Sequence, residues 1–448
     1  MATSLVHIGD FHAAAGPRNE DRYRALDQLI AQALQLPALG AWLWPGDLSH
    51  QRQAIADENA LIERLRRMSA VAPVVLVYGN HDLPGDLDKF AAVGSGNPIY
   101  VVDRPQVLRI RLATMEFASI ACLPYPHKHG LVMAGCANPD IVDVAADHLD
   151  AIFMQFAGEL EQAGKRGDYL LFLGHANIGG AITSSGQPNI GREIELSPRH
   201  LDRLTLAGAT YLGLNHIHNG QTIHGAHYPG SICRLDWGEI EEKRWLQVEL
   251  QEEDTAVISH ALDVPPMYYV EGRLTREGFT WECTAGPGGE KQDPPTNDCA
   301  ACHGSGDGEY QIGEGTLPCK PCNGSGVVVS WKGCHVRCRY RFNADEQSVL
   351  NKALVLAEFA EASLFEVDPI AEKAHALRAP GVAAAKTLPD KVAAWCELAG
   401  AVASQGVLDK LAKLETIADP TVHVDAARDW ANDIASGELD EQKATVAA

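Results

Sequence analysis

Apolar runs in the first half of the chain repeatedly end in ionisable or amide side chains, and this pattern constrains the fold more than any other feature. The side chains concerned are, in chain order, Asp10, His12, Asp47, Asn80, His81, Asp82, His175, His216 and His218. Short apolar runs bounded by turn residues are typical of buried strands. A buried charge is costly unless it is paired or binds a metal ion. The repeated strand ends therefore indicate one shared metal site.

The arrangement of these runs predicts a layered α/β domain over residues 1–255. Expected strands cover residues 4–9, 41–46, 74–79, 119–124, 169–175 and 211–216. Segments with apolar residues at helical spacing lie between several of them, for example residues 21–36. Alternating strands and helices are typical of layered α/β folds, in which ligands bind at the carboxyl ends of strands.

The chemistry of the expected ligands favours a dinuclear metal centre. Carboxylate, amide and imidazole groups are present at the strand ends, and no thiolate is among them. This donor set suits manganese, iron or zinc better than a soft metal. Single motifs such as Asp-x-His or Asn-His-Asp are weak signals, because turns and outward-facing strands contain them too. The ordered set of five strand ends is much more specific.

In this order, the motifs resemble the calcineurin-like metallophosphoesterase family. Two details narrow the resemblance: His50 follows Asp47 by three residues, and residues 228–239 read YPGSICRLDWGE. Both are similar to the SbcD-type nuclease subunits of double-strand-break repair. The resemblance covers most of residues 1–250 and continues more weakly beyond. It implies a layered β-sandwich flanked by helices, followed by a small α+β cap domain and C-terminal helices.

The resemblance also implies a role for each residue at the strand ends, with two divalent cations, expected to be Mn²⁺, as cofactors. One cation would be held by Asp10, His12 and His218. The other would be held by Asn80, His175 and His216, and Asp47 would bridge the two. The catalytic residues would be His81 beside the leaving oxygen, Asp82 orienting His81, and His50 at the substrate phosphate.

The chain departs from the family pattern at Asn215, where the family usually has glycine before the His-x-His pair. Glycine there indicates a backbone with positive φ, and asparagine tolerates such a conformation better than most residues. We therefore expect positive φ at Asn215 and an intact site.

Two copies of Cys-x-x-Cys-x-Gly-x-Gly occupy residues 299–306 and 319–326, inside a Gly- and Pro-rich insert expected over residues 284–330. Each Cys-x-x-Cys turn presents two thiolates, so the pair predicts one tetrahedral structural Zn²⁺. The expected ligands are Cys299, Cys302, Cys319 and Cys322. The motif resembles the zinc repeats of DnaJ-type chaperones. The zinc either stabilises the insert alone or also supports contact with DNA or a partner.

The insert interrupts the expected cap domain, residues 263–382. Alternation in residues 333–342 predicts a strand with Arg337, Arg339 and Arg341 on one face, either contacting DNA phosphate or exposed to solvent. Residues 345–365 have the pattern of an amphipathic helix. Ala-rich helices are expected over residues 386–437, either docking on an SMC-type ATPase or packing on the cap, before a tail at 438–448.

Composition limits the cellular setting and the kind of partner. We expect a cytoplasmic protein without a membrane anchor, because no segment approaches the roughly 20 apolar residues of a membrane helix and no signal peptide is evident. Eleven cysteines without an export signal favour reduced thiols or metal ligands. The net charge of -22 is unlike that of proteins that coat nucleic acid by bulk charge.

Three functions remain open from the sequence. The first is an SbcD-like DNA exo- or endonuclease in repair or recombination, with DNA, an SbcC-like SMC-type ATPase and a second copy of the chain as partners. The second is a phosphodiesterase or phosphatase for small nucleotides on the same metal core, which the acidic charge favours. The third is a catalytically inactive zinc-ribbon adaptor, which the intact ligand set disfavours.

Overall fold

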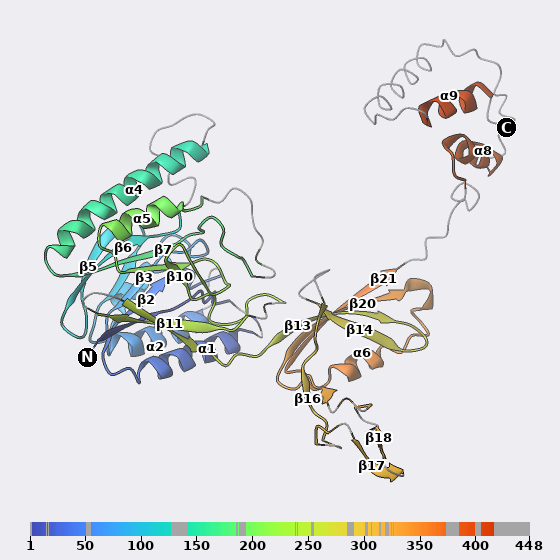
Figure 1. Cartoon of the computed structure of the whole chain (residues 1–448), viewed down its shortest axis with the longest axis horizontal. Coiled ribbons are helices and arrows are strands. Elements are labelled where there is room, and N and C mark those ends of the chain that lie inside the picture. The colour runs from blue at the N-terminus through green and yellow to red at the C-terminus, as the bar shows by residue number, and fades with distance from the viewer. Residues whose placement is uncertain are drawn as a thin grey trace. The chain divides into compact units, whose positions relative to one another are not determined.

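The computed structural model describes residues 2–14, 16, 18–50, 55–126, 141–184, 187, 194–237, 239, 241–251, 255–284, 291–300, 303–305, 307–312, 315–318, 322–323, 325, 327–372, 385–398 and 405–415. These residues form two compact units (Figure 1). The first comprises Met1–Phe342 and Ser348–Ala371, and the second comprises Asn343–Gln347 and Glu372–Ala448.

The N-terminal part of the first unit contains two six-stranded sheets. The first sheet has the order β12-β11-β1-β2-β3-β4, with bounds Thr255–Ala261, Arg244–Leu250, Thr3–His7, Leu39–Pro45, Val74–Val77 and Ile99–Val102. The second has the order β5-β6-β7-β8-β10-β9, with bounds Gln106–Arg111, Phe117–Leu123, Tyr169–His175, Tyr211–Asn215, Ala226–Tyr228 and Gln221–Ile223. Strands β1 to β4 are parallel, as are β6 to β8.

Three apolar clusters hold these sheets and their helices in layers. One lies between the sheets and contains Leu43, Val75 and Leu171. A second packs the first sheet against α1 (Asn19–Ala33) and α2 (Ile55–Ser69). A third packs the other sheet against α4 (Ile141–Gly164) and α5 (Pro198–Leu206), which lie together on the outside in Figure 1. The layered α/β fold is confirmed.

Parallel strands explain why the polar strand ends meet. Because β1, β2 and β3 are parallel neighbours, their carboxyl ends reach the same edge of the first sheet. The carboxyl ends of β7 and β8 are likewise neighbours in the second sheet. Most ligand residues are placed by these ends, and the side chains just beyond them converge.

A five-stranded sheet follows in the order β15-β14-β13-β20-β21, with bounds Lys291–Gln292, Phe279–Thr284, Met267–Leu274, His335–Asn343 and Leu364–Glu372. The described part of the insert adds two small sheets, β16 (Thr296–Asp298) with β19 (Val327–Val329) and β17 (Asp307–Ile312) with β18 (Gly315–Pro318). The alternation expected along β20 is confirmed, since Val336, Cys338, Tyr340 and Phe342 are all buried.

The helix expected over residues 345–365 is wrong in extent. The structure has a short 3-10 turn, η2 (Ala344–Glu346), a single helix α6 (Ala353–Glu358), and then β21. Phe359 is buried in the cap cluster, with Phe365 and Val367 packed against it. Pairing with β20 and burial of these aromatic and branched residues outweigh the helical pattern.

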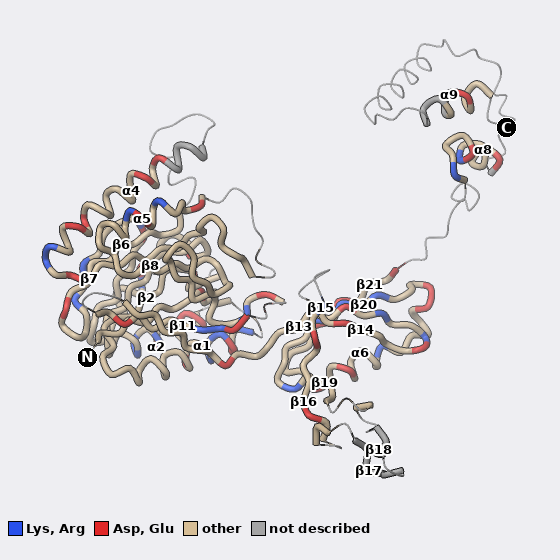
Figure 2. The backbone as a smooth tube through the Cα atoms, in the orientation of Figure 1, with Lys and Arg blue, Asp and Glu red and all other residues tan. Residues whose placement is uncertain are grey.

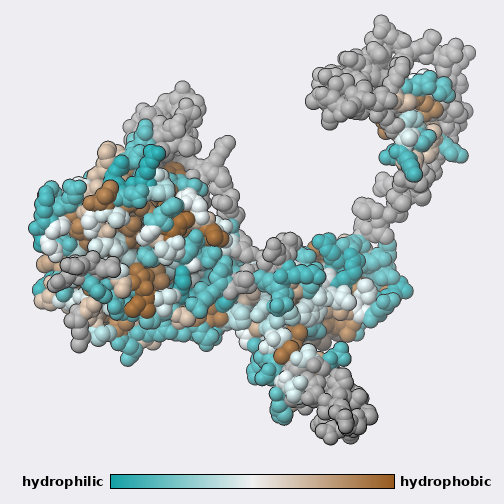
Figure 3. Space-filling model, viewed as in Figure 1, coloured by the Kyte–Doolittle hydropathy of each residue, from teal (hydrophilic) through white to brown (hydrophobic). Residues whose placement is uncertain are grey.

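In the second unit the structure describes α8 (Leu388–Leu398) and α9 (Gln405–Glu415). The rest of the expected helical region and the tail lie outside the described residues. None of the described helices has the length and apolar content needed to cross a bilayer. The face in Figure 3 is largely hydrophilic with scattered hydrophobic patches.

Candidate metal centre

The loops that carry the ligands have an unusual backbone. His12, Asp47 and His216 have φ values of 50°, 53° and 103°, in the left-handed region that non-glycine residues seldom adopt. Such conformations persist only where surrounding structure enforces them, and they cluster at functional sites. Three ligand residues in this state, on three separate loops, therefore point to a site built for binding.

The first group of ligand atoms contains Asp10, His12 and His218, which follow β1 and β8. Nε2 of His12 lies 3.2 Å from Nε2 of His218 and 3.3 Å from Oδ2 of Asp47. Asp10 is fully buried, and its carboxylate accepts the backbone N–H of His216 at 3.2 Å. The structure thus brings together all three residues expected at the first cation.

The second group contains Asn80, His175 and His216, again as expected. Oδ1 of Asn80 lies 2.9 Å from Nε2 of His175 and 3.0 Å from Nδ1 of His216. Nε2 of His175 is also 3.2 Å from Oδ2 of Asp47. Asp47 is 1% exposed, and the same carboxylate oxygen faces both groups. This is the position that a bridging ligand requires.

These separations fit shared cations. Two ligand atoms each about 2.1 Å from one ion, at angles between square and tetrahedral, lie about 3.0 to 3.4 Å apart. The measured distances within each group fall in or next to that range. The two Nε2 atoms of His12 and His218, 3.2 Å apart, can both be ligands of one cation when each ring carries its proton on Nδ1. The donor set therefore fits two divalent ions.

Electrostatics around Asp47 support this fit. Burial by itself would raise the pKa of Asp47, but the imidazoles of His175 and His12 hold it below the usual range. Burial would likewise lower the pKa of His175, whereas the Asp47 carboxylate raises it to about 9. In the metal-free protein a protonated His175 therefore supplies the positive charge that a cation would supply when bound.

At the mouth of the site, His50 and His81 stack with ring centroids 4.8 Å apart. Nδ1 of His81 lies 3.2 Å from the backbone oxygen of His50. That oxygen can only accept, so Nδ1 of His81 donates to it and Nε2 stays available. His50 also approaches His12, with Nδ1 atoms 3.3 Å apart.

Asp82 does not orient His81, contrary to the expectation. Its buried carboxylate accepts backbone N–H groups of Asp47 at 2.9 Å, Ser49 at 3.0 Å and Gly79 at 2.9 Å. Burial raises the pKa of Asp82 to about 7, and the Asp47 carboxylate adds to this rise. Asp82 therefore braces the loops that carry Asp47 and Asn80, and the His50 backbone orients His81.

Asn215 does not have positive φ, so that expectation is wrong. It is the last residue of β8, and the left-handed residue is the next one, His216. The Asn215 amide donates to the Ile8 carbonyl at 3.1 Å, and its oxygen lies 3.0 Å from Nε2 of His7. The asparagine side chain thus links β8 to β1, a contact that glycine cannot make.

Several residues that support the site had no role assigned from sequence. Ser231 and Tyr228 belong to the quoted segment 228–239: the Ser231 N–H donates to the His218 carbonyl, and the Tyr228 hydroxyl donates to Ala176, beside His175. Gln187 uses both ends of its amide, donating to the His216 carbonyl and accepting from the His218 N–H. Glu239 and Lys243 form a buried ion pair. The segment 228–239 marked Tyr228, Ser231 and Glu239 in the sequence, but their contacts, and those of Gln187 and Lys243, depend on the packed fold.

Two of the three arginines of β20 lie close to a carboxylate on the neighbouring strand. Arg337 donates twice to Oδ2 of Asp368 on β21, at 2.9 and 2.8 Å. Arg339 lies 3.9 Å from the same oxygen, and Arg341 is exposed. Figure 2 marks these basic positions along β20. The first two side chains are therefore engaged by a carboxylate.

In the insert, Cys299 and Cys322 are buried together in one small cluster with Val328. Cys302 and Cys319 lie outside the described residues. His303 and Asn323 occupy the same position in the two repeats, directly after the second cysteine, and have nearly equal φ values of 52° and 49°. The residue directly after the second cysteine therefore has nearly the same left-handed φ in both motifs.

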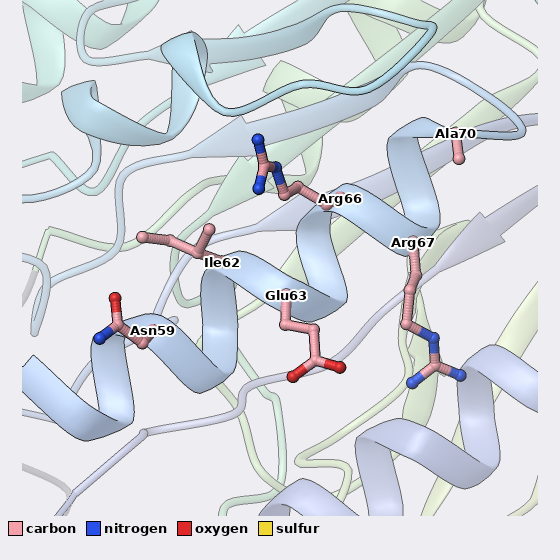
Figure 4. Close-up of a pocket in the computed structure, with 6 residues that line it drawn as sticks. All are labelled: Asn59, Ile62, Glu63, Arg66, Arg67 and Ala70. Atoms are coloured by element: carbon pink, nitrogen blue, oxygen red, sulfur yellow. The ribbon is translucent and has the colours of Figure 1, made fainter.

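A surface groove of about 500 Å³ lies along α2 (Figure 4). Its lining residues are Asn59, Ile62, Glu63, Arg66 and Arg67 of α2 and Ala70, which directly follows the helix. Arg67 is paired with Asp27 at 2.8 Å. The groove contains none of the ligands above.

Comparison with known proteins agrees with this site. Residues 3–196 match the family model of the calcineurin-like phosphoesterases. The match supports a metallophosphoesterase domain and metal-dependent hydrolysis of phosphate esters. The crystal structure of TT1561 of Thermus thermophilus is similar at 13% identity, with 58% of this chain and 99% of that chain covered and a TM-score of 0.36. A second solved structure has the same identity and coverage, with a TM-score of 0.35.

Proposed function

We propose that the chain is an SbcD-like nuclease subunit that hydrolyses DNA phosphodiesters with two divalent cations, expected to be Mn²⁺, and works with an SMC-type ATPase in repair or recombination. The observation that carries the metal chemistry is the pair of ligand groups that share Asp47. We also propose the domain division expected from the sequence, with a catalytic domain at 1–255 and a cap at 263–382.

Two cations bound in this site would neutralise phosphate charge and lower the pKa of a bound water toward neutrality. The protein residues have separate tasks. Asp47 would be a ligand of both cations, and Asn80 with His175 and His216 would hold the second. His81, whose Nδ1 is engaged by the His50 backbone, presents Nε2 to protonate a leaving oxygen. His50 stacks on it and contributes a second imidazole for the phosphate.

DNA as the substrate is supported by the segment 228–239, which resembles the nuclease branch and contributes Ser231 and Glu239 directly behind the metal ligands. The ATPase partner is supported by α8, whose Trp395 is 60% exposed, as an apolar helix face for docking requires. A homodimer is proposed from the resemblance alone.

For the insert we propose one structural Zn²⁺ bound by Cys299, Cys302, Cys319 and Cys322. Support comes from the buried pair Cys299 and Cys322 and from the matching φ angles of His303 and Asn323. The β16–β19 sheet beside them has only three residue pairs, so a metal site would help to hold it together. Elemental analysis should give about one zinc per chain, lost in Cys299→Ser and retained in the control Cys338→Ser. Zinc retained in Cys299→Ser would contradict the assignment.

One observation favours a small-nucleotide phosphodiesterase as a second candidate. Arg337 and Arg339 lie at Asp368, so they offer less positive charge to a DNA backbone than the sequence alone indicated.

The experiment that separates the two candidates compares linear duplex DNA with bis(p-nitrophenyl) phosphate, using the full chain and Mn²⁺. The proposal expects degradation of the DNA, with His81→Ala as the inactive control. Hydrolysis of the dye ester with intact DNA would favour the small substrate. If the protein binds metal but hydrolyses neither substrate, the catalytically inactive zinc-ribbon adaptor would be favoured.

A further inference from the structure

A buried ion pair lies directly behind the first cation site. Glu239 is fully buried and Lys243 is 2% exposed. The Lys243 ammonium is 2.7 Å from Oε2 of Glu239 and 2.9 Å from the hydroxyl of Ser231. A buried ion pair is seldom more stabilising than apolar residues of similar volume. Stability alone therefore does not explain why Glu239 and Lys243 are present here.

The other oxygen of Glu239 points at a metal ligand. Oε1 of Glu239 lies 3.4 Å from Nδ1 of His218, and neither atom has a hydrogen-bond partner among the described residues. The opposite nitrogen of the same ring, Nε2, is the atom that faces His12 in the first group. The Glu239 carboxylate, the His218 ring and the first cation site thus lie in a row, with the imidazole in the middle.

A third cation is a competing interpretation of this cluster. His218, Asp236 and Glu239 bring three ligand atoms within 4.8 Å of one another. However, the Lys243 ammonium already occupies the positive position next to Glu239. A divalent ion there would be repelled by Lys243 and would need the ring nitrogen that faces the carboxylate. The cluster is therefore better explained as support for the first site.

We propose that Glu239 is a positioning residue of the first cation site: it fixes the His218 ring and its tautomer through Nδ1, so that Nε2 is presented as a basic ligand, and Lys243 holds Glu239 in place. A carboxylate behind a ligating histidine makes that histidine a better donor and restricts its rotation. Lys243 also reaches the His218 carbonyl at 3.5 Å. The inference rests on the proposed function only in requiring that two cations bind.

The two cation sites differ in this respect. His175 turns its Nδ1 to the Pro45 carbonyl at 2.8 Å, a neutral acceptor. His218 instead faces a carboxylate, Glu239, whose other oxygen lies 2.7 Å from the Lys243 ammonium. Loss of the Glu239 charge should therefore weaken the first site and leave the second nearly unchanged. If Glu239 were needed only for packing, its substitution would not weaken the first cation site more than the second.

The test is Mn²⁺ titration of the metal-free full chain by calorimetry and electron paramagnetic resonance. Glu239→Gln should lower the affinity of one of the two ions roughly 10- to 100-fold. The spectrum at one equivalent should then be that of an isolated Mn²⁺. Glu242→Gln, an exposed neighbour with the same charge change, is the control and should bind as wild type does.

A second variant covers the case in which Glu239→Gln leaves Lys243 unpaired and unfolds the domain. Glu239→Gln with Lys243→Met removes both charges and should fold while showing the same selective loss of one ion. Wild-type affinity for both ions in either folded variant would overturn the inference, as would equal weakening of both ions. Failure of the wild type to cut DNA while it binds two ions would overturn the proposed nuclease but leave this inference standing.

Discussion

Asp82 gives the sharpest test of how the ligand loops are held. Its carboxylate accepts three buried backbone N–H groups at 2.9 to 3.0 Å, two from the loop after β2 and one from the end of β3. Asp82→Ala leaves these three donors without their acceptor. Each such donor costs about 1–3 kcal/mol, so the total lies between about 3 and 9 kcal/mol. Because water admitted to the space left by the side chain can accept some of these bonds, we expect about 3 kcal/mol.

The assay is urea unfolding of the metal-free protein at pH 7, so that cations do not stabilise the loops. Asp82→Asn should cost less than Asp82→Ala, since its amide oxygen accepts some of the three donors. Asp86→Ala, on the same loop, is the matched control and should change stability by less than about 0.5 kcal/mol. A loss below about 1 kcal/mol for Asp82→Ala would show that these three hydrogen bonds do not hold the ligand loops.

The remaining predictions concern the site itself. His81→Ala should keep both cations and lose most turnover, whereas Asp47→Ala should lose both, as measured by metal content and steady-state kinetics; equal metal loss in the two variants would contradict the separation of roles. Because the pKa of His175 is raised to about 9 in the metal-free protein, a cation must displace a proton, so Mn²⁺ affinity should rise with pH up to about 9 with proton release detectable by calorimetry in different buffers. Affinity independent of pH would count against this. Arg337→Ala should leave the salt dependence of DNA binding nearly unchanged, because Asp368 engages Arg337; a smaller salt slope in the variant would show that Arg337 contacts phosphate.

The ligand set could be predicted from sequence because its signal is local. Each ligand lies at or just after the end of an apolar strand. Parallel strands have their carboxyl ends at one edge of the sheet, so these residues come together there whatever the details of side-chain packing. The groups around Asp47 accordingly contain the expected members. The alternation along β20 is local in the same way, with side chains on opposite faces.

The supporting contacts could not be predicted, because they depend on tertiary packing. The family resemblance assigned Asp82 to the adjacent His81, but backbone N–H groups from the loop after β2 donate to its carboxylate instead. Asn215 was interpreted through backbone conformation, yet its side chain joins two strands far apart in sequence. Glu239 lies behind His218 only after the chain between them has folded back. The helix expected over residues 345–365 is limited to Ala353–Glu358, because the chain that follows forms β21 at the edge of a sheet. The apolar pattern of the segment does not indicate this strand.

The most direct test of the central claim is anomalous diffraction at the manganese edge from crystals of the full chain grown with Mn²⁺. The account predicts two peaks, one beside Asp10, His12 and His218 and one beside Asn80, His175 and His216, with Asp47 between them. A single peak, or none at these side chains, would contradict it.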